Sequence, residues 1–369
     1  LLSSNIAFYS RYEIIYHTLL RFYKVLDVKG RKKLTSKIRL QIEGLSEEEA
    51  QKTVYRSNKS EIESRLQSLG PLMYKLVRGF TNNKSEQYQL LCRVFDEHYT
   101  LTKDKRVELR QRALIKSDSV QSPHDPDSTF RKKGNQKVKG YSTNVTETTS
   151  EDSLNLITDV IVNRANTSDS EFVQPAIERT TQVTGQKVNT VYVDGGYQSP
   201  KNDKFCKDID MVYTGIQGGP PRYDLEMTSD GLMVTDTKTG ECLRAKLAKK
   251  RRNNKEDKWQ IKTDNGYQYF NLQAIRASAL RRKMKKRPLE ELHKRNNVEA
   301  TIFQLCYFLR NNKSKYRGRY KIQTWAYARS LWINLVRIQA FMKQTCQRTG
   351  QSIENIAKSV SSFKQMALF

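Results

Sequence analysis

The sequence predicts an α/β protein, because two kinds of hydrophobic periodicity occupy different parts of its 369 residues. Residues 5–115 carry apolar side chains at helical spacing. Residues 139–193 instead contain short apolar or alternating runs, rich in Thr and Val, that are typical of strands. A predicted helix joins the last two of these strands, and a strand reached through such a helix is normally parallel and interior.

The amino-terminal region, residues 1–116, is predicted to be a helical subdomain or insertion. Its first helix is indicated by apolar side chains on one face, namely Phe8, Tyr12, Ile15, Leu19 and Phe22. We expect two further helices, one over residues 46–70 with Ser46 as its N-cap and one over residues 85–101. None of them carries a chemical motif.

The predicted core, residues 117–206, begins with a polar, turn-rich loop over residues 117–138. Two strands follow, at residues 139–149 and 154–164. The short turn between them suits a hairpin.

The rest of this core is a predicted helix followed by a third strand. Ser168 and Glu171 fit a capping box at the start of the helix, and Gly185 fits its carboxyl-terminal stop. Pro175 lies inside the helix, so the position of its first turn stays open. The third strand reads TVYV and ends on Asp194.

Beyond the core we expect a β-rich insertion with basic flanks at residues 207–287, because short strand patterns alternate there with Gly-containing turns. Residues 288–345 are predicted to be the carboxy-terminal core helices, and residues 346–369 a tail. Glu299 lies in the first part of this helical region. The side chains expected to form a buried stripe beside it are Val298, Ile302, Leu305 and Leu309.

The charge balance predicts a polyanionic partner. Lys and Arg total 66 against 39 Asp and Glu, a net charge of +27, which favours nucleic acid. The residues expected to contact DNA are Lys249, Lys250, Arg251, Arg252, Arg281, Arg282, Lys313, Lys315, Arg317 and Arg319. Tyr316 and Tyr320 interleave with the last four, a pattern that combines charge neutralisation with stacking. A solvated basic face is the alternative interpretation. No apolar run approaches membrane-spanning length, so we expect no membrane partner.

Asp194 is the first candidate metal ligand. It follows a buried strand, where α/β proteins gather ligands. Gly195 and Gly196 come next, and they allow a sharp turn that leaves space beside the carboxylate. An ordinary Asp-Gly-Gly turn is the alternative. Hard divalent cations need several oxygen ligands, so one aspartate is not enough.

Glu299 is the second candidate. Arg295 precedes it by one helical turn and could orient its carboxylate or bind a phosphate. The alternative is a plain surface ion pair at i, i+4 spacing, which contributes a few tenths of a kcal/mol.

In combination, the stretches VYVDGGYQSPKN and RNNVEATIFQL resemble the second and third catalytic motifs of bacterial insertion-sequence transposases of the DDE class. Residues 125–147 also resemble the segment that these proteins carry before their second strand. The likeness covers roughly residues 115–345. Two positions depart from the family pattern: Leu292 stands where a tyrosine is common, and Cys306 where a lysine is common.

The resemblance implies a ribonuclease-H-like mixed sheet flanked by helices, with a helical amino-terminal insertion and a β-rich insertion before the last catalytic helix. It implies that Asp194 and Glu299 are the second and third ligands of two Mg²⁺ (or Mn²⁺) ions. Arg295 is then the helix partner of Glu299, and Tyr197 has a structural or DNA-side role.

The first aspartate of the family lies ahead of the helical insertion. We therefore expect it just upstream of Leu1, in a longer reading frame that was truncated or split. Asp125 and Asp127 are the alternatives within the chain, and turn formation is the other interpretation of both.

The expected function is that of a transposase, which cuts DNA at the ends of an insertion sequence and joins them to a target. Its expected partners are double-stranded DNA (element ends and target) and a second copy of the chain, in the bacterial cytoplasm with the nucleoid. Two alternatives remain: a truncated transposase relic that binds DNA without cutting it, and a basic RNA-binding scaffold protein. The scaffold gives no reason for Asp194 and Glu299 to approach each other.

Overall fold

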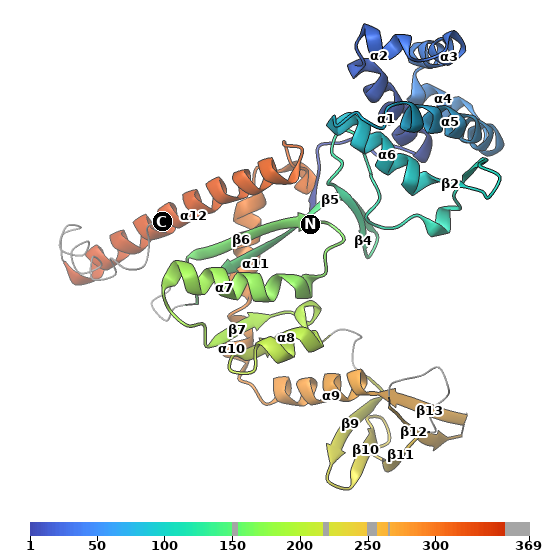
Figure 1. Cartoon of the computed structure of the whole chain (residues 1–369). Coiled ribbons are helices and arrows are strands. Elements are labelled where there is room, and N and C mark those ends of the chain that lie inside the picture. Colours follow the sequence, from blue (N-terminus) through green and yellow to red (C-terminus); the bar gives the residue numbers. More distant parts are fainter. Residues whose placement is uncertain (150–153, 217–220, 249–256, 265, 351–369) are drawn as a thin grey trace. The chain divides into compact units, whose positions relative to one another are not determined.

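The computed structural model contains both helices and several β-sheets, which confirms the predicted α/β class (Figure 1). It describes residues 1–149, 154–216, 221–248, 257–264 and 266–350. The chain forms two compact units, each discontinuous in sequence. Unit 1 comprises Leu1–Asn144, Val160–Thr167 and Leu305–Trp332, and unit 2 comprises Val145–Asp159, Ser168–Gln304 and Ile333–Phe369.

Six helices build most of the amino-terminal part of unit 1: α1 (Arg11–Val25), α2 (Val28–Lys32), α3 (Ser36–Glu47), α4 (Ala50–Arg56), α5 (Lys59–Gly79) and α6 (Glu86–His98). They enclose a core that includes Ile15, Leu19, Phe22, Met73 and Leu91, all fully buried. Burial of such side chains is the main stabilising contribution in a helical layer of this kind. The predicted helix near residue 85 is confirmed, with Ser85 as its N-cap.

Two details of the helical prediction are wrong. Ser46 lies in the last turn of α3, and the helix that follows has Glu49 at its N-cap without a side-chain hydrogen bond. Phe8 lies ahead of α1 and is 61% exposed. The reason is that Ser10 and Glu13 form a capping box that starts the helix after Phe8.

Residues 99–109 also depart from the helical prediction. They form an antiparallel hairpin of β2 (Tyr99–Leu101) and β3 (Val107–Leu109). Tyr99 is buried against α5, where Gly70 leaves room for its ring.

The first sheet combines β1 (Leu2–Ser3), β4 (Thr129–Lys133), β5 (Gln136–Glu147) and β6 (Ile157–Arg164). The predicted pairing of the two strands after residue 138 is confirmed, because β6 pairs with β5. The predicted loop over residues 117–138 is wrong in its second half, which forms β4 and the start of β5. β1 is antiparallel to β5, with Leu2 opposite Tyr141.

The segment that precedes Asp194 folds largely as predicted. The capping box of Ser168 and Glu171 opens a 3₁₀ turn, which leads into α7 (Val173–Thr184). Gly185 ends this helix in the left-handed conformation, with φ of 67°. Pro175 lies in the first turn of α7, where a backbone N–H has no partner within the helix, so the ring is tolerated.

The third predicted strand is β7 (Thr190–Val193). It pairs in parallel with β8 (Asp210–Tyr213), and α8 (Pro200–Phe205) connects the two. The prediction placed the sequence of β8 in the β-rich insertion. That placement is wrong, because its partner is β7.

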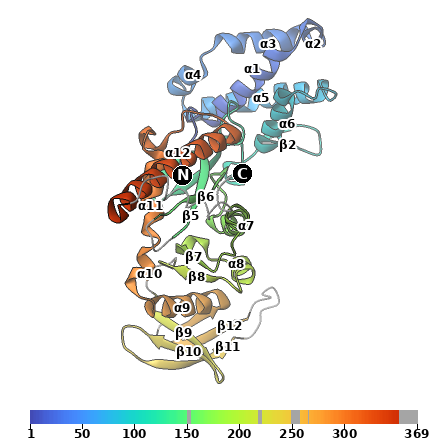
Figure 2. The same cartoon turned by 90° about the vertical axis from the view of Figure 1, so that its left-hand side faces the viewer.

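The β-rich segment forms a five-stranded antiparallel sheet of β9 (Tyr223–Thr228), β10 (Gly231–Asp236), β11 (Cys242–Leu247), β12 (Lys258–Thr263) and β13 (Gly266–Asn271). α9 (Leu272–Lys285) follows β13 and packs beside β9, as Figure 2 shows. Leu232, Val234 and Phe270 are buried against Ile275 of α9. The sheet therefore has a hydrophobic core of its own.

The carboxy-terminal helices are α10 (Leu289–His293), α11 (Asn296–Cys306) and α12 (Arg319–Thr349). The predicted buried stripe on α11 is wrong at Ile302, which is 41% exposed, because Thr301 takes the buried position instead. Over the part of the chain that the structure describes, no helix has the combined length and apolar character that crossing a membrane requires.

Candidate active site

Asp194 lies where β7 ends, and the backbone turns away directly after it. Its Oδ1 accepts a hydrogen bond from the backbone N–H of Gly196 at 2.8 Å, which caps a single 3₁₀ turn over residues 195–197. The predicted sharp Asp-Gly-Gly turn is therefore present. Its other carboxylate oxygen, Oδ2, is directed to Arg295.

Arg295 stands one residue ahead of α11 and contacts both candidate carboxylates. Its Nη1 lies 2.7 Å from Oε1 of Glu299, and its Nη2 lies 3.5 Å from Oδ2 of Asp194. The predicted ion pair of Arg295 and Glu299 exists. The structure adds that the same guanidinium reaches Asp194, so two carboxylates about a hundred residues apart in sequence meet at one side chain within unit 2.

The strand that carries Asp194 is held by a small hydrophobic cluster. Val193 of β7 packs with Met211 and Tyr213 of β8, and α7 contributes Val173 and Ile177. Such packing fixes the end of the strand, which is what a site that must hold a carboxylate in place needs.

Tyr197 packs partly buried against this same cluster. Its backbone oxygen accepts a hydrogen bond from Nδ2 of Asn202 at 2.8 Å. Of the two roles expected of Tyr197, structural or DNA-side, this position favours the structural one.

An ion network ties β8 to the helices that lead to Arg295. Oδ1 of Asp210 lies 2.8 Å from Nζ of Lys283, and its Oδ2 pairs with Arg287. Arg287 also pairs with Glu291 of α10 at 3.1 Å. Lys283 and Arg287 are the main reason that the pKa of Asp210 lies below its ordinary value. The network connects the strand beside β7 to the segment that carries Arg295.

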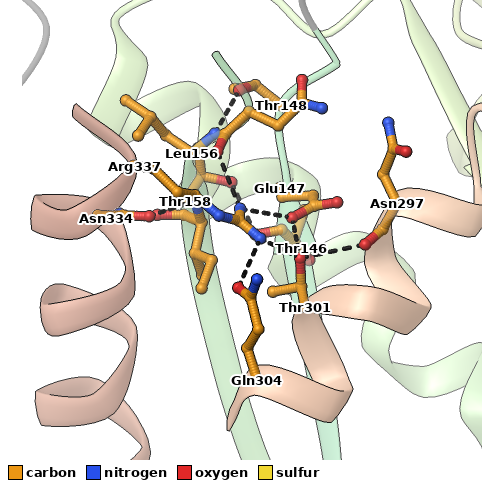
Figure 3. A network of polar contacts seen from close by, with 12 residues as sticks. Thr146, Glu147, Thr148, Leu156, Thr158, Asn297, Thr301, Gln304, Asn334 and Arg337 are labelled. Atoms are coloured by element: carbon orange, nitrogen blue, oxygen red, sulfur yellow. Dashed lines mark hydrogen bonds and ion pairs between the residues drawn. The ribbon is translucent and has the colours of Figure 1, made fainter. Parts of the chain in front are cut away.

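A second network was not predicted from the sequence (Figure 3). The Glu147 side chain, at the end of β5, is 1% exposed, and its Oε2 accepts hydrogen bonds from Arg337 Nη1 at 2.9 Å and from Thr301 Oγ1 at 2.5 Å. Arg337 also donates to the backbone oxygen of Asn155 at 2.9 Å. Because Thr301 is two residues beyond Glu299, this network fixes α11 on the strands. A glutamate in an alternating strand gives no signal of a partner so far along the chain.

Asp125 and Asp127 both lie in unit 1. Asp125 is 1% exposed, accepts a hydrogen bond from the Tyr141 hydroxyl at 2.5 Å, and accepts another from the Ser4 hydroxyl. It anchors the first residues of the chain to the segment that precedes β4. The half-exposed Asp127 lies 3.9 Å from Arg164. Asp194 and Glu299 belong to unit 2 instead.

The predicted DNA-contacting residues fall into three groups. Lys249, Lys250, Arg251 and Arg252 lie outside the described residues. Arg281 is half-buried on α9 and lines a cavity beside Tyr223 and Phe270.

Arg282 is engaged within the fold, since it pairs with Asp224 at 2.7 Å and donates to the backbone oxygen of Leu225. These contacts give Arg282 a structural role in holding α9 on β9.

Lys313, Lys315, Arg317 and Arg319 are all exposed around the start of α12. Arg317 donates to the backbone oxygen of Asn5, and Arg319 donates to the side chain of Asn163 at 3.2 Å. The exposed cations are therefore partly ordered by contacts within unit 1.

The site offers oxygen donors of the kind that Mg²⁺ and Mn²⁺ prefer. Asp194 and Glu299 carry such oxygens, and each of them is paired with Arg295. Within the described residues no group of three or more His, Cys, Asp or Glu side chains is placed to hold a metal ion. The remaining ligands would have to be water, phosphate oxygens or another carboxylate.

Comparisons of the chain with protein-family models, with curated proteins and with solved structures found no match. The function is therefore inferred from the site and from the motifs that form it.

Proposed function

We propose that this chain is the catalytic part of a DNA transposase of the DDE class, with a ribonuclease-H-like fold. The observation that supports this most directly is the meeting of Asp194 and Glu299 at Arg295. Both carboxylates contact the same guanidinium although about a hundred residues separate them in sequence, and oxygen donors brought together in this way can serve as ligands of a divalent cation. A basic RNA-binding scaffold would give no reason for this arrangement.

The order of elements also supports the proposal. An antiparallel pair, β5 and β6, is followed by α7, by the parallel pair β7 and β8, and then by α11 with Glu299. This is the order that the resemblance implies for the core, with a β-rich sheet between the second and third ligands.

Asp194 and Glu299 would hold Mg²⁺ or Mn²⁺, which would supply Lewis-acid chemistry at a phosphodiester. Asp194 and Glu299 provide oxygen ligands from two different elements. Arg295 orients Glu299, and the exposed cations near the start of α12 bind the DNA backbone. We propose double-stranded DNA, at the element ends and at the target, as the substrate, and a dimer in the bacterial cytoplasm as the working form.

The second candidate is a relic that binds DNA and does not cut it. It is favoured by one observation, namely that Asp194 and Glu299 do not belong to a group of three possible ligands in the described part of the chain. With one ligand of a three-carboxylate site missing, ion binding would be too weak for catalysis.

The experiment that distinguishes these functions is a DNA-end cleavage assay with the full product of the encoding gene. We compare the unchanged protein with Asp194→Asn, Glu299→Gln and a control, Glu226→Gln, which makes the same chemical change at an exposed position of β9. The transposase proposal expects cleavage that needs Mg²⁺, is lost in the first two variants and is kept in the control. Cleavage by Asp194→Asn at the unchanged rate would show the assignment to be wrong.

The binding measurements that accompany this assay identify the alternatives. DNA binding that weakens steeply with salt, without cleavage in any variant, would favour the relic. A preference for RNA with no dependence on divalent cations would favour the scaffold.

A further inference from the structure

Arg295 occupies the place between the two carboxylates where a cation is expected. The guanidinium is planar, permanently charged and able to donate from two nitrogens at once. Here one nitrogen is directed to Glu299 and the other to Asp194. The Arg295 side chain is 22% exposed, whereas the side chains of Asp194 and Glu299 are 39% and 63% exposed, so water screens the contact with Glu299 more strongly than the contact with Asp194.

The two contacts differ in length and in origin. The contact with Glu299 is short, at 2.7 Å, and joins two residues one turn apart on the same helical segment. The contact with Asp194 is longer, at 3.5 Å, and joins two separate elements. A longer contact between charged groups is the weaker one and breaks first.

Asp194 can exchange the ion-pair partner of one carboxylate oxygen while the other oxygen stays fixed. Its Oδ1 is fixed by the backbone of Gly196, so the carboxylate keeps its orientation when Oδ2 changes partner. Oδ2 is the oxygen that faces Arg295. An ion that binds Oδ2 therefore competes with Arg295 without disturbing the turn.

We propose that Arg295 is a built-in counter-ion of this site, which offsets the repulsion between Asp194 and Glu299 with its single positive charge and gives up Asp194 when a divalent cation binds. This inference rests on the proposed function, because it assumes that the two carboxylates bind a metal ion. It adds a regulatory role, since the arginine charge both stabilises the metal-free protein and lowers its affinity for the metal.

The counter-ion role predicts two opposite effects of Arg295→Gln, which keeps hydrogen-bonding ability and removes the charge. Without Mn²⁺ the variant should have a lower Tm, because the repulsion between the carboxylates is no longer compensated. It should also bind Mn²⁺ more tightly, by about tenfold, because a positive charge a few ångströms from the ion is gone.

The test measures the Kd for Mn²⁺ by calorimetry and the Tm with and without Mn²⁺, on the 369-residue chain. The variants are Arg295→Gln, Arg295→Lys and Asp194→Asn, with Arg244→Gln as the matched control at an exposed position of β11. Arg295→Lys keeps the charge on a single nitrogen and should bind Mn²⁺ nearly as the unchanged protein does. Circular dichroism confirms that each variant is folded.

The outcomes distinguish the inference from the function on which it rests. Tighter Mn²⁺ binding by Arg295→Gln, together with weaker binding by Asp194→Asn, supports the counter-ion role. Unchanged or weaker binding by Arg295→Gln, with binding still lost in Asp194→Asn, overturns that role and leaves the metal site standing. Binding that does not depend on Asp194 in any variant overturns both.

Discussion

The side-chain amide of Gln323, on α12, forms hydrogen bonds with the backbone of Val162 and Val160 in β6, as the backbone of a neighbouring strand would. Its Oε1 accepts from the Val162 N–H at 2.7 Å, and its Nε2 donates to the Val160 oxygen at 2.7 Å. Asn334, three turns further along the same helix, does the same at Ile157, with both hydrogen bonds at 2.9 Å. Two amide side chains thus satisfy four backbone groups of β6. An exposed edge strand is otherwise a template for pairing with another chain.

Loss of one edge amide should destabilise the protein. Gln323→Leu keeps the side-chain volume close to the original and leaves the Val162 N–H and the Val160 oxygen without their partner. We expect a loss of about 2 kcal/mol in the free energy of unfolding, because two backbone groups lose hydrogen bonds. Urea denaturation measures it. Gln339→Leu, at an exposed position of the same helix, is the control and should change stability by less than about 0.5 kcal/mol.

His98 should make the protein sensitive to acid. Burial, with smaller effects from Arg11 and Arg110, lowers its pKa to about 3, and Arg11 donates to its Nδ1 at 3.1 Å. The folded protein therefore keeps the ring neutral, while the unfolded chain takes up a proton below its ordinary pKa of about 6.5. The contribution to stability is complete above pH 6.5 and is lost as the pH falls toward 3.

This linkage predicts that His98 lowers the free energy of unfolding by about 2 kcal/mol between pH 7 and pH 5. His98→Gln, which cannot be protonated in this range, should lose less stability over the same interval. Urea denaturation at both pH values gives the difference. His293→Gln, at an exposed position, should follow the unchanged protein. An equal acid loss in His98→Gln would show that the acid sensitivity lies elsewhere.

Gly140 should not tolerate a side chain. A Cβ there would lie 2.1 Å from the backbone oxygen of Leu2 and 2.7 Å from the nitrogen of Ser4, so β1 would have to leave β5. We expect Gly140→Ala to lower the free energy of unfolding by more than about 2 kcal/mol. Gly44→Ala is the contrasting variant. It lies in α3 with nothing within 4 Å of its Cβ position, and should raise stability by about 0.5–1 kcal/mol. Full stability of Gly140→Ala would show that β1 is not held against β5.

Asp210→Asn should weaken the connection of β8 to α9 and α10. The lowered pKa of Asp210, caused first by Lys283 and then by Arg287, means that its contribution is present above the ordinary carboxyl pKa and is lost as the pH falls below it. We expect a loss of about 1 kcal/mol at pH 7, because the carboxylate is partly exposed and screened. The difference between the variant and the unchanged protein should shrink progressively as the pH falls below the ordinary carboxyl pKa. Asp208→Asn, exposed and two residues away, is the control in the same denaturation series.

Capping and stop signals in the sequence correctly predicted those helices whose first and last residues are determined by a few neighbouring residues. The capping box of Ser168 and Glu171 and the stop at Gly185 are examples, because each involves contacts within one turn. The same kind of rule failed at Ser46, because Ser is common both at N-caps and near helix ends. The sequence pattern alone could not decide whether Ser46 starts one helix or lies at the end of the preceding one.

Contacts between distant segments could not be predicted in this way. The pairing of β8 with β7 was missed, because a short apolar run does not specify its partner. For the site, the motifs identified Asp194, Arg295 and Glu299, whereas the contact of Arg295 with Asp194 became visible only in the structure. The Glu147–Arg337 pair lies outside any motif, because its members are held by burial and not by spacing in sequence.

The ion pair of Asp210 and Lys283 also has a consequence for how such a chain can evolve. Asp210 precedes the five-stranded sheet and Lys283 follows it, yet their side chains are 2.8 Å apart. The chain therefore enters and exits the segment that contains this sheet at neighbouring positions in unit 2. The sheet also has a hydrophobic core of its own. A segment of this kind can be lengthened, exchanged or lost between relatives with little change in loop-closure entropy, while the strand that carries Asp194 keeps its course.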